Sequence, residues 1–84
     1  MSYKIEIGPK AKKDFDKLPK EVALKVTKKL HQLKENPFRY LEHFAGGGYK
    51  LRIGSYRALI DVNFITTTLI VRILDKRGRI YKRL

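Results

Sequence analysis

The stretch that decides the fold is Tyr49–Val62, with the sequence YKLRIGSYRALIDV. Apolar or aromatic residues alternate with cations up to Gly54-Ser55, and the apolar set then continues beyond this pair: Tyr49, Leu51, Ile53, Tyr56, Ala58, Ile60 and Val62. A period of two is typical of a half-buried β-strand. A glycine-led pair suits a two-residue hairpin turn. The sequence therefore predicts an antiparallel hairpin of residues 49–53 and 56–62.

The turn fixes which residues of this hairpin face each other. With Gly54 and Ser55 in the turn, Arg52 lies opposite Arg57. The other expected pairs are Ile53 with Tyr56, Leu51 with Ala58, Lys50 with Leu59 and Tyr49 with Ile60. Opposed like charges cost up to about 1 kcal/mol at an exposed site, and an anion between them would reverse the sign. The pattern thus indicates a polyanion-binding face, the alternative being that both arginines simply point into water.

Length and charge bound the class of protein. The 84 residues make a single domain, residues 1–84, and 20 Lys and Arg against 8 Asp and Glu give a formal charge of +12. Such a field attracts RNA, DNA, an anionic membrane or an acidic protein, and composition alone does not choose among them. With no cysteine, disulfides and thiolate metal sites are excluded. Neither a signal peptide nor a membrane-length apolar run is present, so we expect a cytoplasmic protein that binds no membrane.

A short strand and two helices are predicted before the hairpin. Residues 3–7 alternate, with Tyr3, Ile5 and Ile7 on one face. Apolar residues spaced by three and four then predict helices over residues 9–18 and 19–35. A proline opens each helix, and Asn36-Pro37 ends the second one. The tight connection between the helices predicts that they form an antiparallel pair.

Residues 38–48 show no regular period and are predicted to form a loop. Its apolar side chains are expected to pack beneath it: Phe38, Tyr40, Leu41 and Phe44. The loop ends in Gly46-Gly47-Gly48, which lacks the following helix and the GKS or GKT continuation of a phosphate-binding loop. We therefore expect these glycines to give only a flexible lead-in to the hairpin.

A third strand is predicted over residues 67–74, after a turn at residues 63–66. An even loop length pairs Val62 with Thr67, Ile60 with Leu69, Ala58 with Val71 and Arg57 with Arg72. Arg52, Arg57 and Arg72 then form a basic stripe over three neighbouring strands. An odd length would flip Arg72 to the other face, and the sequence leaves this open because residues 69–74 are apolar on both parities. The basic tail, residues 75–84, is expected to fold back along the sheet edge.

The candidate chemistry depends on basic and tyrosyl side chains. His31 and His43 are not at metal-ligand spacing, and no histidine is placed to activate Ser55. Most carboxylates, Glu42 included, are expected on or beside the helices and the first strand. We therefore expect no metal and no cofactor. Lysine, arginine and tyrosine can still cleave RNA, because the ribose 2′-OH is an internal nucleophile that needs alignment and phosphate stabilisation.

The chain resembles the RelE-type toxins of prokaryotic toxin–antitoxin pairs, within the wider RelE/ParE group. The resemblance covers nearly the whole chain: an opening strand, KKDFDKLPKEV, ENPFR, YKLRIGSYRALI and the closing DKRGRIY. It implies an α+β fold, namely an antiparallel β-sheet of about four strands with an N-terminal helical hairpin packed on one face. The implied element order is strand, helix, helix, strand, strand, strand.

The resemblance also implies a catalytic set, because the RelE group cuts messenger RNA in the ribosomal decoding site with basic and tyrosyl residues. The matching positions here are Lys50, Arg52, Arg57, Arg77 and Tyr81. Lys50 and Tyr81 are expected to transfer protons and the arginines to stabilise the phosphate. Arg52 stands where the best-studied members carry lysine, and Arg79 could take the part of Arg77. The remaining cations of this region are expected to bind RNA: Arg72, Lys76, Arg79 and Lys82.

The expected function is therefore a ribosome-dependent, metal-independent mRNA endoribonuclease that inhibits translation. The family implies a cognate antitoxin, an acidic or amphipathic segment that wraps the basic surface, with the ribosome and mRNA as further partners. One alternative is a ParE-like toxin, which shares the fold but acts on DNA gyrase and tends to lack this basic and tyrosyl set. Another is a non-catalytic nucleic-acid-binding protein. The combination of Tyr81 with the four cations favours the nuclease.

Overall fold

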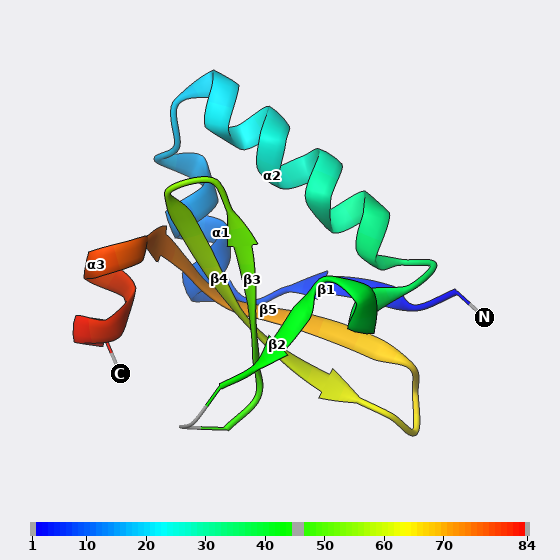
Figure 1. Ribbon diagram of the computed structural model, residues 1–84. Helices are drawn as coiled ribbons and strands as arrows, with labels where there is room; N and C mark the ends of the chain where they lie inside the picture. The colour runs from blue at the N-terminus through cyan, green and yellow to red at the C-terminus, as the bar shows by residue number, and fades with distance from the viewer. Residues whose placement is uncertain (1, 45–46, 84) are drawn as a thin grey trace.

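The computed structural model describes residues 2–44 and 47–83, and these form a five-stranded sheet in the order β1-β5-β4-β3-β2 (Figure 1). The strands are β1 (Lys4–Ile7), β2 (Leu41–His43), β3 (Tyr49–Ile53), β4 (Tyr56–Asn63) and β5 (Thr68–Lys76). Neighbouring strands are antiparallel, except that β1 runs parallel to β5. The α+β class is confirmed, whereas the expected all-antiparallel sheet of about four strands is wrong.

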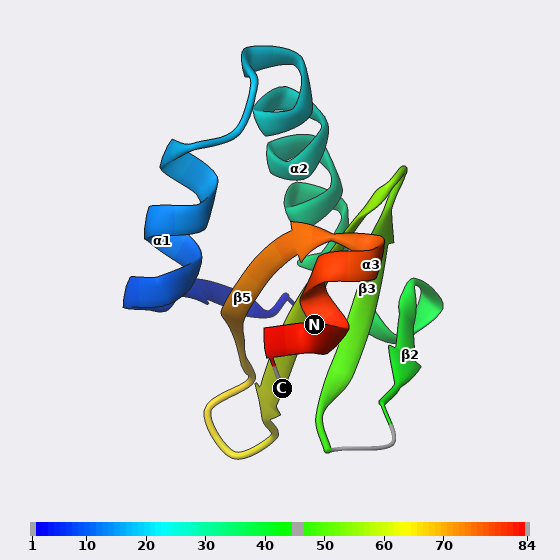
Figure 2. The same ribbon diagram turned by 90° about the vertical axis from the view of Figure 1, so that its left-hand side faces the viewer.

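Two helices cover one face of this sheet, as predicted. They are α1 (Pro9–Asp16) and α2 (Lys20–Leu33), each ending two residues before its predicted end. The chain ascends through α1 and descends through α2, so the two run in opposite senses (Figure 2). They diverge over the sheet, because α1 lies against β5 and α2 against β3. In the part of the chain that the structure describes, no helix is long and apolar enough to cross a bilayer.

The main hydrophobic core lies between these helices and the sheet. Leu33 of α2, Leu51 of β3 and Leu69 of β5 have no exposed surface. The strands supply alternate residues to this core, as the period of two predicts, except that a β-bulge places Leu74 three residues after Val71. Its buried members are Ala11, Val26, Leu30, Leu33, Leu41, Leu51, Ile53, Ala58, Ile60, Leu69, Val71 and Leu74.

The β3–β4 hairpin has the predicted register, including the pair Arg52 and Arg57. The turn is Gly54-Ser55, and Gly54 has φ +58°. This is the left-handed region that glycine enters without a steric penalty, which explains why the hairpin turns at this position. The opposed arginines follow directly from that turn.

The register between β4 and β5 differs from the prediction. Val62 pairs with Leu69 and not with Thr67, and Arg57 pairs with Asp75 and not with Arg72. The strand β4 runs one residue further than predicted, to Asn63, whose side-chain Oδ1 accepts hydrogen bonds from two turn amides at 3.0 and 3.1 Å. A β-bulge beside Leu59 and Ile60 then shifts the pairing by one more residue.

Residues 38–48, predicted as a loop, contain a fifth strand. A 3₁₀ turn, Pro37–Arg39, precedes β2, and Leu41 of β2 pairs with Leu51 of β3. With one buried side chain, Leu41, followed by two exposed residues, β2 is too short to show an alternating pattern. Gly47 and Gly48 have φ +102° and +76°; Gly46, the first residue of the predicted flexible lead-in, lies outside the described residues.

The basic tail folds over the second face of the sheet. We call residues 77–83 the C-terminal segment; it consists of α3 (Arg77–Ile80) and the 3₁₀ turn Tyr81–Arg83, drawn in red in Figure 2. Ile80 is 1% exposed and packs in a second small cluster with Leu59 and Ile73, whose side chains point away from α1 and α2. The expectation that the tail follows the sheet edge is therefore wrong, because this apolar spot on the face attracts it.

Candidate functional site

A pocket of about 250 Å³ lies on the face of the sheet opposite the helical pair. Its lining contains all five residues predicted to be catalytic, together with one residue that was not predicted: Lys50, Arg52, Arg57, Arg77, Tyr81 and Glu42. They come from four elements, β2, β3, β4 and the C-terminal segment. Residues far apart in the sequence thus surround one small volume.

The strand β3 contributes Lys50 and Arg52, which lie two residues apart and therefore on the same side of the sheet. Lys50 faces Glu42 in the β2–β3 register, and its Nζ lies 3.7 Å from Glu42 Oε2. The Lys50 side chain is 27% exposed and that of Glu42 is 51% exposed. Glu42 thus pairs with the charged ammonium at the rim of the pocket.

Glu42 is the site residue that the sequence analysis missed. It was assigned to the surroundings of the helices and first strand, because β2 was not predicted. The only local signal is the pattern of β2 itself, in which Leu41 is buried and Glu42 and His43 are exposed. Three residues are too few to establish a period of two.

Arg57 differs from the other cations because it is buried, with 7% of its surface exposed. Its Nη1 donates hydrogen bonds to the carbonyl oxygens of Gly54 and Tyr56, both at 2.7 Å. The guanidinium therefore braces the hairpin turn, and the alternative in which both opposed arginines merely point into water fails for Arg57. Arg52, its cross-strand partner, is exposed.

The C-terminal segment contributes Arg77 and Tyr81, which are four residues apart and lie on the same side of a helical turn. The backbone N–H of Arg77 donates to the carbonyl of Ser55 at 2.8 Å, which ties the segment to the β3–β4 turn. The Tyr81 ring is stacked on Phe44, with centroids 6.0 Å apart and planes at 18°. The phenol is 45% exposed and so remains accessible to a ligand.

The four residues predicted to bind RNA lie outside this pocket. Arg72 pairs with Asp61 at 3.4 Å, so the predicted arginine stripe over three strands is not formed. Lys76 and Arg79 line a separate groove beside Asp14, whereas Lys82 is exposed in the last turn. Of the two alternatives Arg77 and Arg79, the pocket contains Arg77.

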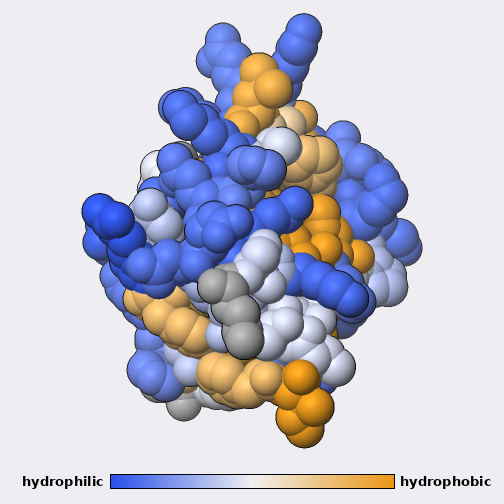
Figure 3. Space-filling view, turned by 90° about the vertical axis from the view of Figure 1, so that its right-hand side faces the viewer, coloured by the Kyte–Doolittle hydropathy of each residue, from blue (hydrophilic) through white to orange (hydrophobic). Residues whose placement is uncertain are grey.

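Positive charge by itself does not mark the pocket, because the chain has 20 Lys and Arg against 8 Asp and Glu. Figure 3 shows hydrophilic atoms over much of another face, with apolar atoms in patches between them and at its lower end. The exposed apolar side chains include Phe38 and Phe64, whose rings are stacked 5.8 Å apart, and Ile65. The pocket is distinguished by the convergence of cations around a phenol.

The arrangement suits a phosphodiester. Four cations, a phenol and a single carboxylate surround a space of small-ligand size, and arginine forks match the oxygens of a phosphate. Hydrogen-bond donors that are already in place stabilise charge that develops during a reaction. Across residues 2–44 and 47–83, no three or more His, Asp or Glu side chains gather closely enough to hold a metal ion.

Comparison with known proteins gives a consistent family and fold. The family model described as "ParE toxin of type II toxin-antitoxin system, parDE" matches residues 5–80. The RelBE2 toxin–antitoxin complex of Mycobacterium tuberculosis contains a chain 25% identical to this one, with a TM-score of 0.84, over 92% of this chain and 100% of that chain. No curated protein matches the sequence.

Two further solved structures show the same architecture. A chain of the intact Escherichia coli RelBE toxin–antitoxin complex is 25% identical, with a TM-score of 0.77, over 89% of this chain and 96% of that chain. A chain of the archaeal RelE–RelB complex from Pyrococcus horikoshii is 24% identical, with a TM-score of 0.78, over 94% of this chain and 99% of that chain. The latter likeness is one of fold.

Proposed function

The chain belongs to the ParE toxin family of type II toxin–antitoxin systems, within the wider RelE/ParE group, and we propose that it is a RelE-type toxin that cleaves messenger RNA on the ribosome. The observation that carries this proposal is the pocket in which Lys50, Arg52, Arg57, Arg77 and Tyr81 meet. A toxin that only bound a protein target would not need a phenol surrounded by phosphate-binding side chains.

The proposed reaction is a transesterification within the RNA. The ribose 2′-oxygen attacks the adjacent phosphorus while the bond from phosphorus to the 5′-oxygen breaks, leaving a 2′,3′-cyclic phosphate and a 5′-hydroxyl. Tyr81, in its deprotonated form, accepts the proton of the 2′-hydroxyl, and the Lys50 ammonium donates a proton to the departing 5′-oxygen. The ion pair with Glu42 at 3.7 Å holds the Lys50 ammonium at the pocket, which supports Lys50 as the donor.

The arginines are proposed to stabilise the phosphorane, which carries more negative charge than the starting phosphodiester. Arg52 and Arg77 are exposed and free to contact the phosphate oxygens. Arg57 is already engaged with the turn through Nη1, so it contributes charge at a fixed position. Because arginine does not readily lose its proton, Arg52 serves in charge stabilisation and not in proton transfer.

The proposed partners follow from the family and from the charge of the chain. The related M. tuberculosis and E. coli toxins were solved with their antitoxins. We propose that this chain likewise binds a cognate antitoxin, with an acidic or amphipathic segment complementary to the net charge of +12. The remaining partners are the ribosome and its message, so the proposed site of action is the cytoplasm.

Primer extension on translated message after induction tests the nuclease. The wild-type chain should give cuts in phase with codons, and Tyr81→Phe should lower the rate of cleavage by about 10²–10⁴-fold, the usual range for loss of an acid–base group. Lys12→Gln, in an exposed ion pair with Asp16 on α1, is the control expected to cleave normally. Intact message with the wild-type chain would overturn the proposal.

The ParE description of the matching family model favours one other function, inhibition of DNA gyrase. A supercoiling assay with purified gyrase separates the two functions. Loss of supercoiling with intact message would select the gyrase inhibitor, whereas codon-phased cuts with unimpaired supercoiling would select the nuclease. Binding of RNA without either effect would indicate a non-catalytic nucleic-acid-binding protein.

A further inference from the structure

The C-terminal segment carries two of the pocket residues, and its anchoring determines where they lie. It is short, and helical segments of this length are marginal in water without tertiary contacts. Its first residue is held by the Arg77–Ser55 backbone hydrogen bond, and Ile80 is buried against Leu59 and Ile73. Tyr81 comes after both of these anchors.

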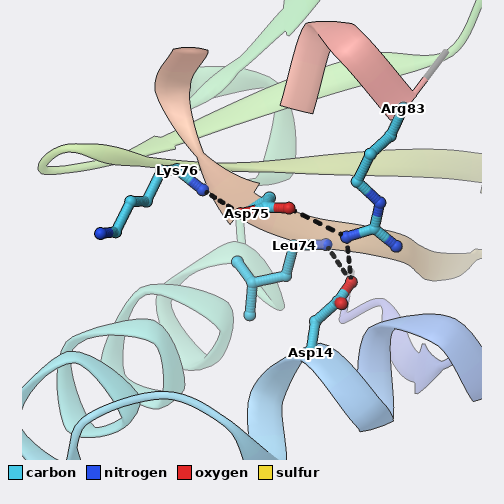
Figure 4. A network of polar contacts seen from close by, with 5 residues as sticks. All are labelled: Asp14, Leu74, Asp75, Lys76 and Arg83. Carbon is cyan, nitrogen blue, oxygen red and sulfur yellow. Dashed lines mark hydrogen bonds and ion pairs between the residues drawn. The ribbon is translucent and has the colours of Figure 1, made fainter. Parts of the chain in front are cut away.

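A third anchor lies beyond Tyr81, at Arg83 (Figure 4). Arg83 Nη1 lies 2.9 Å from Asp14 Oδ2, on α1, and 3.2 Å from Asp75 Oδ2, on β5. The three side chains are 28%, 16% and 17% exposed, respectively. Both carboxylates raise the pKa of Arg83, the hydrogen bond to Asp14 being the largest cause. The three residues are called the Arg83 clamp below.

The two carboxylates of the clamp are also held by backbone N–H groups. Asp14 Oδ2 also accepts a hydrogen bond from the Leu74 N–H at 3.0 Å, and Asp75 Oδ1 accepts one from the Lys76 N–H at 2.8 Å. The β1–β5 pairing ends at Val71, so Asp14 takes the place of a strand partner at Leu74. Arg83 is therefore held between two oriented acceptors, both of them half-buried carboxylates.

We propose that the Arg83 clamp positions Tyr81, and with it Arg77, in the pocket, so that Arg83 is a positioning residue for the cleavage reaction. Tyr81 lies between the Ile80 anchor and the clamp, and its own ring contacts Phe44. Release of Arg83 leaves Tyr81 at the frayed end of a short helical segment. The kinetic part of this inference rests on the proposed nuclease function; the placement of the ring does not.

The test uses the full chain with 3-fluorotyrosine at position 81, observed by ¹⁹F NMR, together with cleavage kinetics on translating ribosomes. Arg83→Gln should move the resonance of residue 81 toward that of free fluorotyrosine. It should lower kcat by about 10–100-fold, the cost of misplacing a reacting group by about 1 Å. Arg83→Lys, which keeps a cation but loses the planar guanidinium, should fall between Arg83→Gln and the wild type.

A second pair of variants separates the clamp from a general loss of charge. Asp14→Asn should reproduce the shift of the resonance and the loss in kcat. Asp16→Asn, on the same helix in an exposed pair with Lys12, should leave both unchanged. In urea titrations every variant should start from a folded state with native β-sheet, because the main core does not include Arg83.

The outcomes distinguish the positioning role from the nuclease itself. An unmoved resonance in Arg83→Gln, or a moved resonance with unchanged kcat, would overturn the proposal. If the wild-type chain does not cleave message but the resonance still moves, the nuclease proposal fails and the placement of Tyr81 by the clamp is upheld.

Discussion

The two faces of the sheet differ, because one forms the hydrophobic core and the other carries the pocket. On the face toward α1 and α2, Leu51, Ile60 and Leu69 are at most 1% exposed and form one continuous core. On the other face the buried apolar cluster shrinks to Leu59, Ile73 and Ile80, and the pocket beside it is lined by charged side chains and Tyr81.

The difference shows how a small domain can keep a charged site without losing stability. The core on one face supplies the burial that folding requires. The other face needs only enough apolar contact to hold the C-terminal segment in place, so its remaining positions can carry cations. Cations that would be costly in a core are tolerated there because most of them reach water or an ion-pair partner.

The largest effect is expected when a core-facing side chain of β3 is truncated. Leu51→Ala removes a side chain with no exposed surface and should lower the free energy of unfolding by about 2–5 kcal/mol in urea titrations. Arg52→Ala, the next residue and on the opposite face, should change it by less than about 0.5 kcal/mol. Equal losses of unfolding free energy in the two variants would show that the core face does not carry most of the stability.

A smaller effect is expected from the buried cation on the charged face. Arg57→Ala removes two hydrogen bonds to turn carbonyls and should cost about 1–3 kcal/mol of unfolding free energy. Arg57 would then serve stability as well as the proposed chemistry. The matched comparison is again Arg52→Ala, and thermal or urea unfolding measures both. Unchanged stability in Arg57→Ala would mean that its contacts with the turn contribute nothing.

The smallest effect is expected at Arg72, which lies outside the pocket. Its ion pair with Asp61 joins side chains that are 64% and 46% exposed, so solvent screens it. Arg72→Ala should change the unfolding free energy by less than about 0.5 kcal/mol, and a double-mutant cycle with Asp61→Ala should give a similarly small coupling. A coupling well above about 1 kcal/mol would place Arg72 in a stabilising network.

Local sequence patterns predicted the pairings that depend on residues close together in the sequence. The β3–β4 register followed from Gly54-Ser55 and the alternation on either side of it. The β4–β5 register did not follow, because the Asn63 side chain accepts two hydrogen bonds from turn amides and a bulge beside Leu59 shifts the pairing. A bulge leaves no distinct signal in a stretch where odd- and even-numbered positions are both apolar, as in residues 69–74.

The candidate site was predicted as a set of residues, and the hairpin register placed its two opposed arginines on one face, but the positions of Glu42 and of the C-terminal segment were not predicted. Arg77 and Tyr81 were assigned by resemblance, and Glu42 was missed because β2 is only three residues long. The expected inclusion of Arg72 among the opposed arginines was wrong, since it pairs with Asp61. These outcomes depended on contacts between different strands and between the sheet and the C-terminal segment.

The sequence by itself determined the family, the β3–β4 hairpin and the side of that hairpin to which each residue points, because periodicity and turn chemistry act over a few residues. Only the tertiary structure decided that β1 runs parallel to β5, that the tail covers a face, and that Arg83 reaches Asp14 across 69 residues of chain. Such contacts depend on how all elements pack together. No local pattern encodes the partner that a strand edge or a charged side chain will meet.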